Sequence, residues 1–150
     1  MHHTLADIIP YLQMAIGPVI LISGVGMLLL TMTNRFGRVI DRSRILARES
    51  GNTPLEKQAA LHEQVAILYR RAKLLRLAIG LASGAALLAG LLIICLFLGA
   101  LLEIKVVFAV ELLFGGSMVF LIASLIVFLQ DINLSLHALT LELKSNKLLE

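Results

Sequence analysis

The stretch TMTNRFGRVIDRSR (residues 31–44) joins an apolar run to a dense basic band. The run before it, residues 7–30, carries a single charge, at its first position. Arginines then occupy positions 35, 38, 42 and 44. Basic residues flank membrane-spanning helices on the cytoplasmic side, so this change from apolar to basic is typical of the inner end of a span. The stretch therefore predicts a membrane protein and its orientation.

Composition supports the same interpretation. Hydrophobic residues make up 59% of the 150 residues and charged residues only 15%, with a mean hydropathy of +0.93. Soluble domains have about 25% charged residues. Three apolar runs reach the roughly 20 residues that a spanning helix needs. We predict a single membrane domain over residues 1–150, with transmembrane helices at 8–32, 77–102 and 106–129.

The distribution of lysine and arginine predicts the topology. Ten of them lie in residues 33–76, none precedes residue 35, and the link between the second and third runs has only Lys105. The N-terminus is then outside and the C-terminus in the cytoplasm. We expect the basic band to meet anionic lipid headgroups, and no nucleic acid.

The segment between the first two runs predicts a cytoplasmic helical hairpin over residues 33–76. Gly51 and Asn52 are typical of a helix end, whereas Thr53, Pro54 and Glu56 form the start signal of the next helix. Apolar residues recur at helical spacing on both sides of this turn. The helix after the turn can continue unbroken to residue 102, and residues 130–150 form a further cytoplasmic helix. The predicted fold class is all-α.

No enzyme motif is present. The sequence lacks H-E-x-x-H, C-x-x-C, G-x-S-x-G and a phosphate-binding glycine loop. The lone Cys95 lies within the second run, where a packing role is expected. We therefore predict no catalytic residue, no cofactor and no metal.

Small residues four apart in the second run, and a small-residue cluster in the third, predict close helix packing. This packing occurs within one chain or between copies, and we expect a homo-oligomer. The residues concerned are Gly80, Gly84, Ala86, Gly90, Gly115 and Gly116.

The first run carries small and polar residues at seven-residue spacing, and the positions beside them become basic. Two interpretations remain open: a tight contact with the other two spans, or the lining of a water-filled path in a ring of subunits. Polar groups inside membranes face protein or water, and rings of arginine select anions. This polar stripe comprises Gln13, Gly17, Gly24, Thr31, Arg35, Arg38 and Arg42.

Two acidic residues complete the candidates. Glu111 is the one ionisable residue within a predicted span, where an interfacial carboxylate or an ion-coordinating role are alternatives. Asp41 lies three residues from both Arg38 and Arg44, which suits a ladder of ion pairs along a helix.

Two motifs carry a family resemblance. NRFGRVIDRSR (residues 34–44) closes the first span, and FLQDI (residues 128–132) leaves the third. With the hairpin between spans, this pattern resembles the bacterial domain of unknown function 2721 family over nearly the whole chain. Asp131 stands where the family more often has Glu. The resemblance implies three spans and brings no established activity.

These observations favour a homo-oligomeric inner-membrane protein with a channel-like, anion-preferring path along its first span. The alternative is a non-conducting scaffold or regulatory adaptor, whose cytoplasmic hairpin binds a protein partner or anionic lipid.

Overall fold

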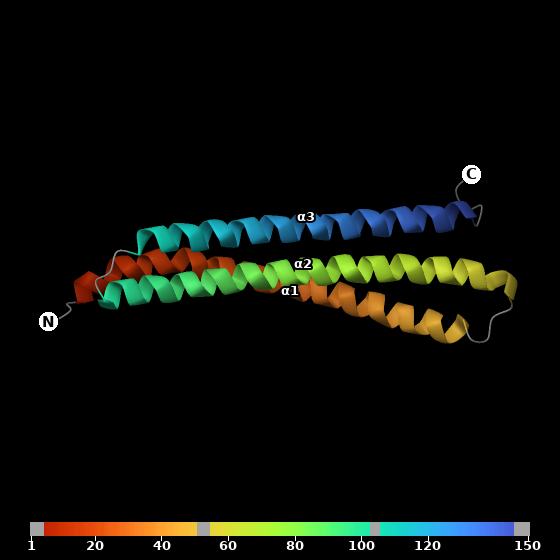
Figure 1. Ribbon diagram of the computed structural model, residues 1–150, viewed down its shortest axis with the longest axis horizontal. Coiled ribbons are helices and arrows are strands. Elements are labelled where there is room, and N and C mark those ends of the chain that lie inside the picture. Colours follow the sequence, from red (N-terminus) through yellow and green to blue (C-terminus); the bar gives the residue numbers. More distant parts are fainter. Residues whose placement is uncertain (1–4, 51–54, 103–105, 146–150) are drawn as a thin grey trace. The chain divides into compact units, whose positions relative to one another are not determined.

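The computed structural model describes residues 5–50, 55–102 and 106–145, which form three long helices (Figure 1). These are α1 (Leu5–Ser50), α2 (Leu55–Leu102) and α3 (Val107–Ser145). No strand occurs within those ranges. The predicted all-α class is confirmed. The turn predicted from Gly51 to Pro54 lies outside the described residues, between the end of α1 and the start of α2.

Each helix is about twice as long as a membrane span requires. α1, α2 and α3 contain 46, 48 and 39 residues, so α2 alone measures about 72 Å at 1.5 Å per residue. Pro10 and Pro18 lie inside α1 without ending it. As predicted, the second helix continues from the hairpin through the apolar run, and the third continues past residue 129 without a break.

All three helices are long and apolar enough to cross a membrane. The segments concerned are Gln13–Arg48, Gln64–Leu102 and Val107–Leu136. Each overlaps one of the spans predicted from the sequence. The chain is therefore a multi-pass membrane protein.

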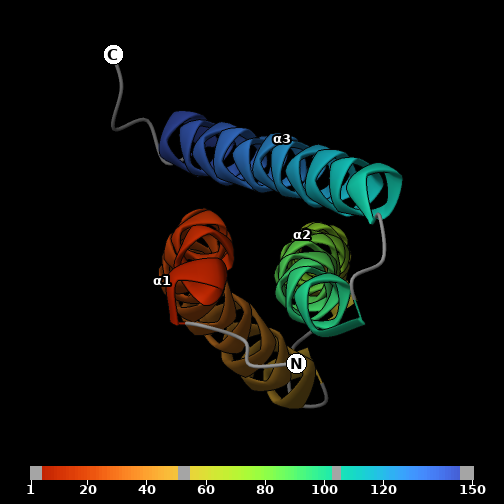
Figure 2. The same cartoon turned by 90° about the vertical axis from the view of Figure 1, so that its left-hand side faces the viewer.

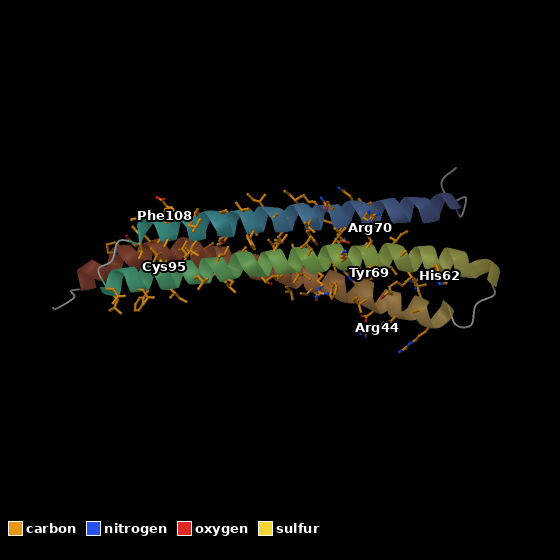
Figure 3. All side chains as sticks on the ribbon, viewed as in Figure 1. Arg44, His62, Tyr69, Arg70, Cys95 and Phe108 are labelled. Carbon is orange, nitrogen blue, oxygen red and sulfur yellow. The ribbon has the colours of Figure 1, made fainter. Side chains whose placement is uncertain are left out.

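The helices contribute to two compact units. The apolar unit contains residues 1–30 and 80–123, and the basic unit contains residues 31–79 and 124–150. Every lysine and arginine among the described residues belongs to the basic unit. Figure 2 shows the same three helices after a turn of 90°. In Figure 3, Cys95 and Phe108 mark the apolar unit, whereas His62, Tyr69 and Arg70 mark the basic unit.

The buried residues recur at seven-residue spacing on each helix. This is the period of helices that pack side by side in a left-handed bundle. On α2 two positions in every seven are buried, whereas α1 and α3 bury one, so α2 presents the widest packing face. The buried residues are Pro18, Val25, Met32, Val39 and Leu46 on α1; Leu75, Ala78, Ala82, Ala85, Ala89, Leu92, Leu96 and Gly99 on α2; and Ser117, Ser124 and Asp131 on α3.

Candidate functional site

The buried face of α3 is polar, in keeping with the tendency of polar residues in membrane helices to face the protein interior. Ser117, Ser124 and Asp131 follow one another at intervals of seven residues, and none exposes more than 1% of its surface. A buried polar group is costly unless it finds a partner, and a buried charge is far more costly. Each of these side chains is therefore expected to bind a group on a neighbouring helix.

The two serines bind backbone carbonyl groups of α2. In the apolar unit, the Ser117 hydroxyl donates to the carbonyl oxygen of Ala85 at 3.0 Å. In the basic unit, the Ser124 hydroxyl donates to the carbonyl oxygen of Ala78 at 2.7 Å. Ser124 follows Ser117 by seven residues on α3, and its partner Ala78 precedes Ala85 by seven residues on α2. Alanine on α2 leaves room for the hydroxyl to reach the backbone, as small residues do in membrane helix pairs.

The next step of this register brings Asp131 to Arg71, which lies seven residues before Ala78. Nε–H of Arg71 donates to Oδ1 of Asp131 at 3.2 Å. From α1, Nη2 of Arg35 lies 3.3 Å from Oδ2 of the same carboxylate. The carboxylate is fully buried, while the Arg35 and Arg71 side chains retain 25% and 17% of their exposure. One charged residue from each helix thus meets in the basic unit.

The two carboxylate oxygens are held differently. Oδ1 accepts a hydrogen bond, whereas Oδ2 accepts none within the part of the chain that the structure describes. The 3.3 Å separation from Arg35 therefore gives Coulomb attraction without hydrogen-bond alignment. The Arg35 guanidinium also lies 5.3 Å from the centre of the Phe128 ring, in cation–π contact. These two contacts hold Arg35 against α3.

Beside this ion-pair cluster lies a cavity of about 280 Å³ that all three helices line. Its polar lining is dominated by guanidinium groups, so we call it the arginine pocket. Neither Arg38 nor Arg42 forms an ion pair or hydrogen bond with any described residue. The lining consists of Arg35, Arg38, Val39 and Arg42 from α1, Leu68 and Arg71 from α2, and Ser135 from α3.

Most of the polar stripe is exposed, although Arg38 and Arg42 also line the arginine pocket. Gln13, Gly17, Gly24, Thr31, Arg38 and Arg42 are exposed. The buried face of α1 instead follows one position later, from Pro18 through Val25 to Met32. A tight contact of this stripe with the other two spans of the same chain is therefore wrong. Arg35 is the exception, because its guanidinium group forms an ion pair with Asp131 and a cation–π contact with Phe128.

The predicted packing glycines separate into two groups. A Cβ at Gly84 would lie 2.7 Å from Cδ1 of Phe120, and one at Gly116 would lie 3.4 Å from Cδ1 of Leu88. Gly84 thus needs a small residue for contact between α2 and α3, whereas a Cβ at Gly116 would make ordinary van der Waals contact with α2. At Gly80, Gly90 and Gly115 a Cβ would meet nothing within 4 Å, so their role in packing within the chain is not supported. Ala86 is half-buried.

The two acidic candidates have different outcomes. Glu111 is exposed near the start of α3, without a resolved partner among the described residues. Asp41 is also exposed, and the described residues show no ion pair between it and Arg38 or Arg44. The predicted ladder along α1 is therefore wrong, since the exposed side chains gain little from pairing in water. No group of three metal-binding side chains occurs in the described part of the chain.

Sequence reasoning missed the ion-pair cluster. Asp131 was noted only within the FLQDI motif, and Arg71 only as one of the basic residues of the hairpin. The available signal is the seven-residue spacing of Ser117, Ser124 and Asp131 in an otherwise apolar helix. That spacing places a hydroxyl, a hydroxyl and a carboxylate on one helix face.

Three apolar helices with a buried polar face on α3 and a basic unit define a class of small helical multi-pass membrane proteins. The chain belongs to the family described as protein of unknown function (DUF2721), which it matches over residues 15–141. The matched region includes Arg35, Arg71 and Asp131. No curated protein and no solved structure matches the chain.

Proposed function

We propose that the protein is a non-enzymatic homo-oligomer of the bacterial cytoplasmic membrane, in which the exposed polar stripe of α1 lines a path for anions shared between copies. The observation that carries this proposal is the exposure of Gly17 and Gly24 in open space. Glycine within a helix costs about 1 kcal/mol relative to alanine. No contact within the chain requires a missing Cβ at either position, and both glycines share a helix face with the exposed Gln13 and Thr31, which Gly26 does not. Contact of this face with another copy is therefore the reason that we infer.

The polar members of the stripe support an aqueous or protein-covered surface. Gln13 and Thr31 are exposed on a helix that is apolar enough to cross a membrane. Polar side chains at membrane depth face protein or water rather than lipid. Facing copies of α1 satisfy this requirement, and small residues between them leave space along the shared axis.

The preference for anions follows from the basic end of the same stripe. Arg38 and Arg42 are exposed and lack a carboxylate partner among the described residues. A ring of such residues from several copies attracts anions and repels cations. Arg35 has no part in this ring, because it is tied to Asp131.

The orientation is part of the proposal. The basic unit faces the cytoplasm, so that both the hairpin and the C-terminus are inside and the N-terminus is outside. The support is that every described lysine and arginine belongs to one unit. A periplasmic position of a reporter fused at Ser50 would contradict this orientation.

The experiment compares Gly24→Leu with Gly26→Leu in lipid nanodiscs. Both glycines are exposed and open, but Gly26 lies two residues later, on another face of α1. The mass of the wild-type complex is expected to be a multiple of 16.3 kDa, and Gly24→Leu to lower it while Gly26→Leu does not. In planar bilayers, Arg38→Ala is expected to reduce the anion-to-cation permeability ratio. An oligomer that conducts no ions at any voltage or pH rejects the path and leaves the scaffold or adaptor as the function.

A further inference from the structure

The arginine pocket has an excess of positive charge that its own residues do not neutralise. Four guanidinium groups line it, and among the described residues only Asp131 forms ion pairs with any of them. Asp131 supplies one negative charge to Arg35 and Arg71 together. Arg38 and Arg42 line the same cavity without a carboxylate partner among the described residues, so a bound anion would relieve the mutual repulsion of the arginines.

We propose that the arginine pocket binds a phosphate group. Guanidinium groups match the oxygens of phosphate with parallel N–H donors, which favours arginine over lysine at phosphate sites. The polar lining consists of four arginines and the hydroxyl of Ser135, and it contains no lysine and no carboxylate. This composition is suited to a tetrahedral oxyanion and unsuited to a cation.

The ion-pair cluster fixes part of the pocket before a ligand arrives. Arg71 uses Nε–H for Asp131, and a guanidinium carries five N–H donors in all. Arg35 is held by Asp131 and by the Phe128 ring. Both arginines also line the pocket, so the buried carboxylate orients two guanidinium groups at its wall. Such preorganisation lowers the entropy cost of binding.

The size of the pocket restricts the ligand. About 280 Å³ lies at the lower limit of small-molecule sites, which range from roughly 300 to 1,000 Å³. A phosphate group fits within this volume. The ligand is inorganic phosphate or the phosphate of a larger molecule.

The position along α1 admits two sources for this phosphate. Arg38 follows residue 32, the end of the first span predicted from the sequence, by six residues, or about 9 Å along the helix. This distance suits the headgroup phosphate of a lipid at the surface of the membrane, and equally a free phosphate from the adjoining solution. Both sources offer the same oxyanion to the same arginines.

The test measures binding to purified full-length protein in a phosphate-free maltoside detergent by isothermal titration calorimetry. The two probes are inorganic phosphate and the short-chain lipid dioctanoylphosphatidylglycerol. The variant is Arg38→Gln with Arg42→Gln, two arginines four residues apart that form no ion pair with a described residue. The matched control is Arg44→Gln with Arg48→Gln, also four apart, exposed and on α1, but outside the pocket lining. Figure 3 shows Arg44 on the side of α1 that faces away from α2 in that view.

We expect at least one probe to bind the wild-type protein and the pocket variant to bind it about tenfold or more weakly, which corresponds to about 1.4 kcal/mol. The control variant is expected to bind within about twofold of wild type, since it removes the same charge from elsewhere on α1. Binding of the lipid alone identifies a headgroup site, binding of phosphate alone identifies a free anion, and mutual competition identifies a site open to both. Helix content by circular dichroism confirms that both variants fold.

Two results would overturn the proposal. The first is an absence of binding for both probes to the wild-type protein. The second is an equal loss in the pocket variant and the control, which would indicate diffuse attraction rather than a site. The outcome is separate from the proposed oligomer, because the pocket belongs to one chain: phosphate binding is expected to persist in Gly24→Leu even where the mass of the complex falls.

Discussion

Arg71 and Asp131 lie 60 residues apart in the sequence, yet Nε–H of Arg71 donates to Oδ1 of Asp131 at 3.2 Å. The contact joins α2 to α3 at a carboxylate that is fully buried. Arg35 from α1 completes the cluster at 3.3 Å. Because each helix supplies one member, the cluster fixes the relative positions of the three helix segments within the basic unit.

Asp131→Asn is expected to lower the free energy of unfolding by about 3–5 kcal/mol. The substitution keeps the shape of the side chain but leaves Arg35 and Arg71 without a counter-charge in a partly buried setting. The matched control is Asp41→Asn, which removes an exposed carboxylate without a described ion pair and is expected to change stability by less than about 0.5 kcal/mol. Because the chain has no tryptophan, unfolding in mixed micelles is followed by circular dichroism. Equal stability of the two variants would contradict the role of the cluster.

Replacing all three charges at once is expected to restore stability. The variant Arg35→Met, Arg71→Met, Asp131→Leu removes the desolvation cost of the ions together with their attraction, and such exchanges are often neutral or stabilising by about 1–4 kcal/mol. The same unfolding assay is expected to rank it above Asp131→Asn. A triple variant that is no more stable than Asp131→Asn would indicate that α3 needs a polar group at this position.

Ser124→Ala is expected to lower the free energy of unfolding by about 0.6 kcal/mol, the average for a hydrogen bond between membrane helices. The lost bond is the one from the Ser124 hydroxyl to the Ala78 carbonyl oxygen at 2.7 Å. Ser23→Ala serves as the control, because the exposed Ser23 hydroxyl binds only the carbonyl oxygen of Val19 on its own helix. A loss of the same size at Ser23 would show that the assay reports helix propensity rather than contact between helices.

Gly84→Ala and Gly80→Ala are expected to change stability in opposite directions. At Gly84 the new Cβ would meet the Phe120 ring at 2.7 Å, and overpacking of this kind costs about 1–3 kcal/mol. At Gly80 the new Cβ meets nothing within 4 Å, so alanine is expected to stabilise the helix by up to about 1 kcal/mol. Combining Gly84→Ala with Phe120→Ala is expected to recover part of the loss. Destabilisation of equal size at both glycines would contradict the assignment of Gly84 alone to the contact with α3.

The helices themselves could be predicted from the sequence because their causes are local. Apolar runs of sufficient length, the basic band after residue 34 and the signals around residues 51–56 indicated three long helices joined by short connections. The unbroken passage of α2 from hairpin to span also followed from local pattern. These signals do not determine how each helix is rotated about its axis relative to its neighbours.

Rotation and register explain the errors at the candidate site. The small-residue motif beginning at Gly80 predicted close packing, but the buried face of α2 follows Ala78, Ala82, Ala85 and Ala89 instead. Arg35 and Arg38 belong to the same polar stripe. The Arg35 side chain nevertheless lies against α3, because Asp131 is within ion-pair distance of it. Contacts between residues 60 or more positions apart depend on how the helices align, and one sequence carries that information only through the spacing of polar residues such as Ser117 and Ser124.

The central claim is that the exposed stripe of α1 meets another copy of the chain, and disulfide formation between single cysteines measures this contact directly. In a Cys95→Ala background, Gly24→Cys is compared with Gly26→Cys in native membranes after mild oxidation. Gly24→Cys is expected to give a dimer of about twice 16.3 kDa on a non-reducing gel, whereas Gly26→Cys remains a single chain. A single chain for both variants, or equal dimer for both, would contradict the claim.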